Sequence, residues 1–444
     1  METTSPVQTP AILEAGKDMH ALLARLFPIC RSITGNGVRQ TLAIVQEYLP
    51  ALQLHEVPSG TPALDWQVPA EWNIRDAWVK NAAGERVIDF RQHNLHVVGY
   101  STPVRGWFSR QELDEHLFSL PEQPDLLPYR TSYYQPTWGF CLSHQHRLAL
   151  QDAYYEVCID STIDEQGFLT YGELELPATE AGENPANEVL FSCHCCHPSL
   201  ANDNLSGLVV AVALAQTLAA QPVRHYTYRF VFGPGTIGSI VWLSRNPEAI
   251  ARIRHGLVLT LLGGPGPFTY KQSRRGSAAV DRAVALALRD AAVAHNIRPW
   301  LPYGYDERQY CSPGFNLPVG CLSRTPFGEF PEYHTSADNL DFVQPKQLAE
   351  ARALLLRICG IFERDQVYRN LRPYGEPQLG RRGLYKGIGG GLEGQEWQMA
   401  LLWVLSLSDG DHSLVAVAEQ ANLPFELLQR AAEALATTDL LAPV

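Results

Sequence analysis

An apolar strand, a polar turn and an apolar helix follow one another in the chain, which reads VLFSCHCCHPSLANDNLSG at 189–207 and LVVAVALAQTL at 208–218. Residues 189–192 predict a buried strand, and Leu205–Leu218 predicts a helix. The turn between them holds two histidines, three cysteines and an aspartate. Ligands of open α/β sheets bind beyond the carboxyl ends of the strands, so this turn is a candidate site.

The alternation of strands and helices continues on the C-terminal side of this stretch. Further strands are predicted at 226–232, 256–262 and 317–322, and helices at 278–295 and 344–364. Strands that alternate with helices indicate a mostly parallel sheet covered by helices on both faces. The expected fold class is therefore α/β.

Three segments of different character flank this α/β region. Residues 11–50 predict two helices, and 57–175, rich in Trp, Tyr, Pro and short alternating runs, predicts a β-rich insertion. A Gly- and Arg-rich stretch at 371–392 indicates a connecting loop. Beyond it, helices are predicted at 396–407, 414–420 and 424–436, and the short turn between the last two is typical of a helix-turn-helix.

Bulk composition excludes several classes of protein. The 444 residues, 45% of them hydrophobic, predict two or three folded domains rather than disorder. The net charge of -12 argues against nucleic acid as a partner, because phosphate contacts need clustered Lys and Arg, and 396–444 holds only Arg430 and His412 as basic residues. The sequence shows no membrane-spanning run, and residues 1–10 lack a signal-peptide pattern. Nine unevenly spread cysteines then favour reduced thiols and a cytoplasmic location.

Other interpretations of the turn at 193–207 stay open. A histidine at a strand end is often only a hydrogen-bonded residue, and an aspartate before a helix is often only its N-cap. Three thiols also suggest a structural Cys/His zinc site, but no second cysteine pair lies at a suitable spacing. Imidazole and carboxylate together suit a catalytic zinc, and the cysteines are expected to be reduced and partly buried.

Two more polar clusters stand out, FPEYHTSADN at 330–339 and YDERQYC at 305–311. Each has a simpler interpretation. The cluster at 330–339 could be an ordinary surface loop, and the cluster at 305–311 could be a solvated run of charges. Together with HPSLANDNLSG at 197–207 and PGTIGS at 234–239, they resemble, in order, a bacterial family of aminopeptidase-like proteins. The resemblance covers nearly the whole chain, including SGT at 59–61, DW at 65–66 and YGEP at 374–377.

The resemblance implies a zinc exopeptidase-like α/β fold with a β-rich inserted domain and a C-terminal winged helix. The expected parts are N-terminal helices at 1–58, the inserted domain at 59–160, the α/β domain with the metal site at 161–370, and the winged-helix-like domain at 371–444.

The family is similar to the di-zinc aminopeptidases, and this similarity implies the metal ligands. Asp203 takes the place of their bridging carboxylate, and His334 that of their distal histidine. The upstream ligand is His197 or His194, and the family motif favours His197. The paired glutamates and the further aspartate of those enzymes are missing at 232–239 and 261–264, and so is the aspartate two residues after the first histidine. One zinc ion per chain is therefore expected.

The implied activity is zinc-dependent hydrolysis of an amide, at a peptide N-terminus or in a small biosynthetic compound. Glu307 is the first choice for the general base, followed by Asp306 and Glu332, and Tyr333 or Arg308 could stabilise the oxyanion. The alternative is a catalytically degenerate fold that acts as a metal-containing binding or regulatory module. The expected partner is a small peptide or amide substrate, with no membrane and no nucleic acid. The C-terminal domain leaves room for self-association.

Overall fold

The computed structural model describes residues 10–179, 187–384 and 392–444. Residues 1–9 of the N-terminal stretch 1–10, and part of the predicted loop at 371–392, lie outside the described residues. The chain divides into two compact units, Met1–Gly276 with Asn296–Ala353, and Ser277–His295 with Leu354–Val444. The four-part domain division drawn from the sequence stays a prediction.

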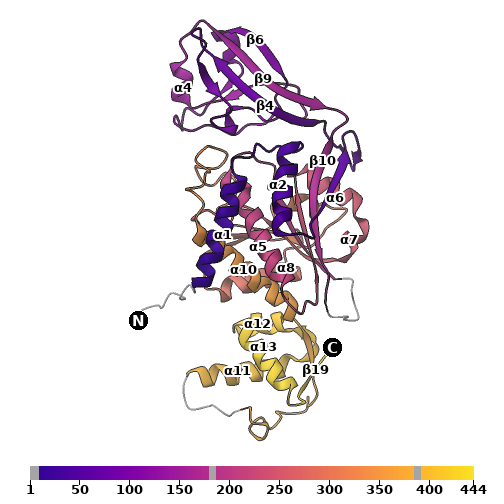
Figure 1. Ribbon diagram of the computed structural model, residues 1–444. Coiled ribbons are helices and arrows are strands. Elements are labelled where there is room, and N and C mark those ends of the chain that lie inside the picture. The colour runs from indigo at the N-terminus through magenta and orange to yellow at the C-terminus, as the bar shows by residue number, and fades with distance from the viewer. Residues whose placement is uncertain (1–9, 180–186, 385–391) are drawn as a thin grey trace. The chain divides into compact units, whose positions relative to one another are not determined.

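An eight-stranded sheet, of which β10 is labelled in Figure 1, contains the predicted strands of the α/β region. Its strand order is β1-β10-β12-β11-β13-β16-β14-β15. Four adjacent strands in its middle, β12, β11, β13 and β16, are parallel, while antiparallel pairing brings in β1, β10 and β14. The predicted α/β fold with a mostly parallel sheet is thus confirmed. The strands are β1 (Gln53–Pro58), β10 (Phe168–Leu176), β11 (Glu188–His194), β12 (Thr227–Gly233), β13 (Ile253–Leu259), β14 (Phe268–Lys271), β15 (His295–Arg298) and β16 (Val319–Ser323).

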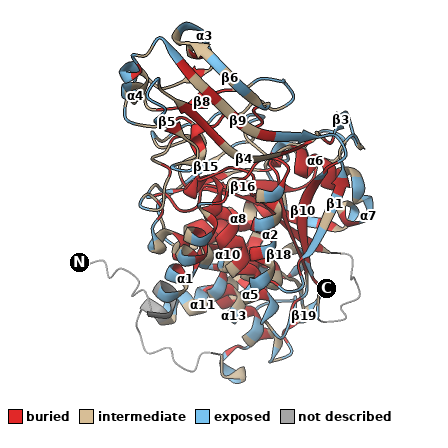
Figure 2. Ribbon diagram, turned by 45° about the horizontal axis from the view of Figure 1, so that its top comes forward, coloured by how far each residue is buried: buried red, intermediate tan, exposed pale blue. Residues whose placement is uncertain are grey.

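Helices cover both faces of this sheet. α5 (Gly207–Ala219) packs on β11, β12 and β13, and α2 (Asn36–Tyr48) packs on β10. On the other face, Leu190 of β11 belongs to the apolar core that includes α6 (Ile237–Arg245). Buried residues accordingly gather on inner strands such as β10 and β16, whereas the edge strand β1 is mostly exposed (Figure 2). The remaining helices of this region are α1 (Pro10–Leu26), α7 (Pro247–Arg252), α9 (Glu307–Tyr310) and α10 (Pro345–Arg364).

The predicted β-rich insertion contains a four-stranded antiparallel sheet in the order β5-β4-β9-β6. Alternate residues of its strands, such as Ala77, Val79, Val157 and Ile159, form a separate apolar core. β9 leads through a short turn into β10, which returns the chain to the large sheet. The elements are β2 (Pro62–Ala63), β3 (Trp66–Gln67), β4 (Glu71–Lys80), β5 (Arg86–Asp89), η1 (Asn94–His96), β6 (Val104–Ser109), α3 (Arg110–Asp114), β7 (Leu117–Phe118), β8 (Phe140–Cys141), α4 (His144–Ala149) and β9 (Tyr154–Asp164).

The second unit combines a helical cluster with a small sheet in the order β18-β17-β19. α8 (Ala279–Asp290) packs on α12 in this unit, and Arg282 pairs with Glu419 at 2.5 Å. The prediction of a helix up to residue 295 is wrong at its C-terminal end, because α8 ends at Asp290 and β15 begins at His295. The other elements are β17 (Val367–Asn370), η3 (Gly380–Arg382), α11 (Leu392–Leu407), β18 (Asp409–Ser413), α12 (Leu414–Ala421), α13 (Phe425–Ala436) and β19 (Leu441–Pro443).

None of the helices in the described residues has both the length and the apolar character needed to cross a bilayer.

Candidate metal centre

Two histidines reach one oxygen of Asp203 from the end of strand β11. His194 is the last residue of the strand, opposite Gly233 of β12, and its Nε2 lies 2.9 Å from Oδ1 of Asp203. His197 follows after the chain has left the sheet, and its Nδ1 lies 3.4 Å from the same Oδ1 and 3.2 Å from the carbonyl oxygen of Asp203. The structure thus brings both upstream histidines to the candidate site, whereas the family motif favoured His197 over His194.

His334 approaches the other oxygen of the same carboxylate. Its Nε2 lies 3.0 Å from Oδ2 of Asp203. The side chains of Asp203 and His194 are fully buried, while that of His334 is 33% exposed, so the cluster is open on the His334 side. Burial would raise the pKa of Asp203, but the three histidines outweigh it and hold that pKa well below its usual range. Burial lowers the pKa of His194.

The backbone that carries Asp203 is fixed by a second buried aspartate, Asp338. Its Oδ1 accepts the N–H of Asn202 at 2.5 Å, and its Oδ2 accepts the N–H of Asp203 at 3.0 Å. Its carbonyl oxygen accepts the N–H of Ala201 at 3.0 Å. Burial raises the pKa of Asp338 to about 7. The aspartate of the motif at 330–339 therefore positions the turn rather than facing the histidines.

Two asparagines tie the same turn to the end of β13. Asn202 Oδ1 accepts the N–H of Gly263 at 2.8 Å, and Asn204 Oδ1 accepts that of Leu261 at 3.1 Å. Asn204 Nδ2 also donates to the carbonyl oxygen of Leu259 at 3.0 Å. The segment 261–264, which lacks the aspartate ligand of the di-zinc enzymes, is thus hydrogen-bonded to the turn that leads into α5.

Two residues that no sequence pattern singled out hold the histidines from segments N-terminal to β11. Tyr129, from the insertion, places its ring 5.0 Å from those of His197 and His334 and donates its N–H to the carbonyl oxygen of His334 at 2.8 Å. Arg31 is almost fully buried, and its Nε donates to the carbonyl oxygen of His197 at 2.9 Å. Burial lowers the pKa of Arg31 to about 10, and the guanidinium remains a cation near neutral pH.

The ring of Tyr305 occupies the space beside Gly235, just after β12. Gly235 belongs to the segment 232–239, where the di-zinc enzymes have their paired glutamates. A Cβ at Gly235 would lie 2.0 Å from the ring of Tyr305. That ring lies 4.3 Å from the ring of His194, and its hydroxyl lies 3.7 Å from Sγ of Cys196. Glycine is required at 235 for Tyr305 to reach this place.

The two acidic residues predicted between β15 and β16 are both buried and engaged. Glu307 is fully buried, pairs with Lys271 and accepts the N–H of Tyr305 at 3.1 Å. Asp306 accepts the N–H of Thr236 at 2.6 Å, and burial raises its pKa to about 7. Both carboxylates thus bond to groups other than the three histidines.

The other predicted catalytic residues differ in their surroundings. The ring of Tyr333 stacks on that of His334 at 3.9 Å. Glu332, next to it, is half-buried, and its carboxylate has no ion pair in the described part of the chain. Arg308 is exposed. Tyr333 is therefore the one member of this set in direct contact with a histidine of the cluster.

The three cysteines of the turn, Cys193, Cys195 and Cys196, are free and buried. Burial raises the pKa of each thiol, that of Cys196 to about 12. Within the described residues, the ligand atoms that converge in a group of three or more belong to His194, His197 and Asp203, with no cysteine among them. The arrangement therefore gives no support to a structural cysteine zinc site.

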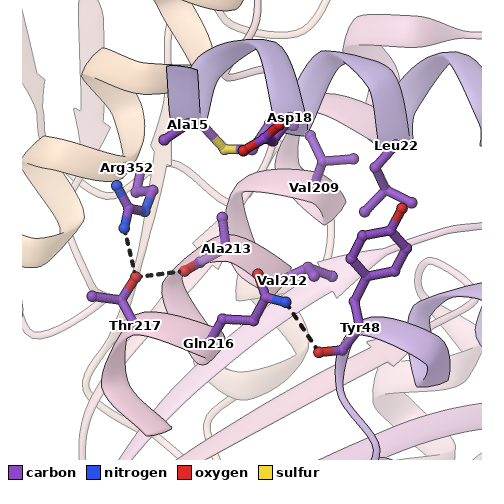
Figure 3. A pocket seen from close by; sticks show the side chains of 11 residues that line it. Ala15, Asp18, Leu22, Tyr48, Val209, Val212, Ala213, Gln216, Thr217 and Arg352 are labelled. Atoms are coloured by element: carbon purple, nitrogen blue, oxygen red, sulfur yellow. Dashed lines mark hydrogen bonds between the residues drawn. The ribbon is translucent and has the colours of Figure 1, made fainter. Parts of the chain in front are cut away.

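A separate hollow of 280 Å³ between α1, α2, α5 and α10 shares no residue with this cluster (Figure 3). Three of its polar side chains bond to one another or to the backbone. Arg352 donates to Thr217 Oγ1 at 2.7 Å, and Gln216 donates to the carbonyl oxygen of Tyr48 at 3.1 Å. The hollow offers no comparable group of metal ligands.

Replacing Asp338 by Asn should destabilise the fold through the Asp203 turn. An amide can accept only one of the two N–H groups and would point its own NH2 at the other. An unsatisfied buried donor costs about 1–3 kcal/mol. Urea unfolding of Asp338→Asn should show a loss of this size, whereas Asp341→Asn, which changes an exposed aspartate of the same loop, should leave the unfolding free energy unchanged. Equal curves for both variants would contradict the positioning role.

The large sheet and the buried cluster at its carboxyl edge together define an α/β protein with a candidate metal centre. Residues 20–365 match the family model described as a domain of unknown function, DUF4910, and residues 366–443 match a winged helix-turn-helix model. The chain belongs to this DUF4910 family.

Known relatives agree with this assignment. A Clostridium acetobutylicum protein, provisionally named a polysaccharide biosynthesis protein with an aminopeptidase-like domain, is 45% identical over 428 residues, 96% of each chain. A crystal structure from the same organism, provisionally called a peptidase, has a TM-score of 0.91 at 43% identity, over 98% of this chain and 97% of the other. A zinc aminopeptidase from Bacillus subtilis has a TM-score of 0.58 at 10% identity, over 78% and 94%, and that likeness shows the fold.

Proposed function

We propose that this chain is a zinc-dependent hydrolase of the aminopeptidase type, which cleaves an amide at a peptide N-terminus or in a small biosynthetic compound. The main support is that three histidines approach the buried carboxylate of Asp203. His194 and His197 lie near its Oδ1, and His334 lies near its Oδ2. Imidazole nitrogen and carboxylate oxygen are the ligands of catalytic zinc sites. The half-open side at His334 provides access for a substrate.

The donor set fits one zinc ion per chain. In the described residues, no further carboxylate or thiol converges with His194, His197 and Asp203. The space at Gly235 is filled by Tyr305, and the segment at 261–264 is bound to asparagines, so neither supplies ligands for a second ion. A bound zinc ion supplies Lewis-acid chemistry, which polarises a carbonyl group and makes water more acidic.

The surrounding side chains then have distinct roles in the proposed reaction. A carboxylate must accept the proton of the attacking water and return it to the leaving amine. Because Glu307 is held by Lys271, we assign this proton to a carboxylate oxygen of Glu332. The hydroxyl of Tyr333 donates a hydrogen bond to the developing oxyanion, since Tyr333 contacts His334 whereas Arg308 is exposed.

A hollow of 290 Å³ next to these aromatic residues suits an apolar part of the substrate. Trp300, Leu301 and Phe327 line it, and the ring of Phe327 lies 6.0 Å from those of both Tyr305 and Tyr333. Its charged lining residues neutralise each other in the pairs Lys271–Glu307 and Arg298–Glu329. A volume near 300 Å³ is at the lower end for small-molecule sites.

The provisional name of the Clostridium relative favours a biosynthetic amide as the substrate. Aminoacyl amides with a chromogenic leaving group remain the direct test of the chemistry, because they report cleavage whatever the natural acyl or amine group is. The purified protein should release the chromophore, lose this turnover in a chelator and regain it with one equivalent of zinc.

A series of alanyl, leucyl, phenylalanyl and glutamyl amides also tests the apolar hollow. We expect leucyl or phenylalanyl amides to be cleaved at least about tenfold faster than the glutamyl amide, since an unpaired charge is costly to bury. Protein that binds one zinc but cleaves none of the amides would instead support the alternative of a metal-containing binding module. The observation that favours this alternative is the absence of the paired glutamates of the di-zinc enzymes.

A further inference from the structure

A polar groove of 540 Å³ lies where the chain enters the β-rich insertion. One wall is the short hairpin of β2 and β3, which bears Asp65, Trp66 and Gln67, and β3 is exposed (Figure 2). Tyr134, from a loop of the insertion, and Glu165, from the turn between β9 and β10, also line the groove. The DW motif at 65–66 thus belongs to a surface that the proposed hydrolysis does not use.

Two aromatic rings meet at this groove and remain largely exposed. Trp66 is 43% exposed and Tyr134 is 52% exposed. Their ring centroids lie 5.6 Å apart at an interplanar angle of 62°, an edge contact that leaves ring faces free. Exposed aromatic faces carry a partial negative charge that attracts polarised C–H groups.

The charged residues that line the groove are both acidic. Asp65 and Glu165 are exposed, and neither forms an ion pair within the described part of the chain. The groove has no Lys or Arg among its lining residues. An anionic ligand is therefore disfavoured, whereas hydroxyl and ammonium groups would find acceptors.

We propose that this groove is a saccharide-binding site for a neutral or amino-bearing sugar. The C–H faces of a pyranose ring would stack on Trp66 and Tyr134, and its hydroxyls would donate to Asp65 and Glu165 and accept from the Gln67 amide. A volume of this size accommodates one or two sugar rings. A proline-rich peptide also binds aromatic grooves, but it would leave the carboxylates without hydrogen-bond donors.

The groove shares a loop with the candidate metal centre. Tyr134 follows Tyr133, whose hydroxyl lies 3.2 Å from that of Tyr129, and Tyr129 packs on His197 and His334. The binding site goes beyond the proposed hydrolysis and does not depend on it, because stacking and hydrogen bonding at the groove require no reaction at the histidines.

Binding of defined trisaccharides to the full-length protein tests this site. Ligand-observed NMR titrations with cellotriose, a glucosamine trimer and trigalacturonate would supply neutral, cationic and anionic probes. We expect dissociation constants on the order of millimolar for the first two and at least tenfold weaker binding of trigalacturonate. A proline-rich decapeptide is the fourth probe.

Trp66→Ala should weaken cellotriose binding at least tenfold, and Trp66→Phe should retain most of it. Trp107→Ala is the matched control, because Trp107 is 62% exposed on β6 and does not line the groove. Asp65→Asn should selectively lower the affinity for the glucosamine trimer. Thermal unfolding checks that each variant is folded.

Three outcomes would overturn the proposal. These are no binding of either cellotriose or the glucosamine trimer at about 10 mM, binding that survives Trp66→Ala, and binding of the decapeptide alone. None of them bears on amide hydrolysis, so the groove and the proposed activity can fail separately.

Discussion

Asp203→Asn should abolish zinc retention. The wild-type carboxylate offers an oxygen to each side of the cluster, Oδ1 toward His194 and His197 and Oδ2 toward His334. An amide is neutral and would direct its NH2 group at one of these sides. Loss of even an outer hydrogen-bond partner lowers metal affinity 10–100-fold in typical sites, so losing the central carboxylate should lower it by at least about 100-fold. Zinc per chain after dialysis, measured by elemental analysis, checks this directly.

Asp306→Asn is the matched control, because Asp306 is similarly buried but bonds to Thr236 and Ser239. This variant should keep its zinc. If Asp203→Asn retained one zinc per chain with wild-type affinity, the cluster would not be the metal site. Two tightly held ions in the wild-type protein would refute the single-ion expectation.

The two upstream histidines provide a finer comparison within the same experiment. Both His194→Ala and His197→Ala should lose most of the zinc, since both nitrogens lie within 3.4 Å of Asp203 Oδ1. His194 is fully buried at the rigid strand end, while His197 depends on Arg31 for its backbone position. Retention of zinc by His194→Ala alone would restore the preference for His197 that the sequence motif suggested.

The position of the site could be predicted from the sequence because its cause is local. The apolar run 189–192 and the helix after it place the polar turn at the carboxyl edge of a parallel sheet, and the structure has β11 and α5 there. The choice between His194 and His197 could not be made, because strand alternation no longer applies once the chain has left the sheet.

Other parts of the site and fold depend on contacts that sequence patterns do not encode. Arg31 and Tyr129 reach the histidines from segments far away in the sequence, and neither lies in a recognisable motif. Strand β18, which reads DGDHS, could not be predicted because it is short and its polar residues have low strand propensity. Its pairing with β17 stabilises it as a strand. The role of Glu307 also depends on a distant contact. Its sequence position between two core segments suggested catalysis, but its ion-pair partner, Lys271, lies on β14.

Glu332→Gln should therefore lower turnover, whereas Glu307→Gln should lower the stability of the fold. The Glu332→Gln change removes the carboxylate proposed to accept the proton, so turnover should fall by roughly 100-fold or more with zinc content and stability unchanged. The Glu307→Gln change leaves Lys271, whose side chain is only 14% exposed, without its ion-pair partner. Breaking such a buried pair costs on the order of 3–5 kcal/mol.

Because Glu307 also accepts the N–H of Tyr305, its loss should disturb the ring beside His194 as well. The measurements are urea unfolding, zinc content and turnover of the best aminoacyl amide, made on both variants and on Arg308→Gln as an exposed control in the same segment. Glu307→Gln should unfold at lower urea, whereas Glu332→Gln should unfold as the wild type does. A Glu307→Gln protein of normal stability and zinc content but about 100-fold slower turnover, beside an unimpaired Glu332→Gln, would assign the proton to Glu307 instead.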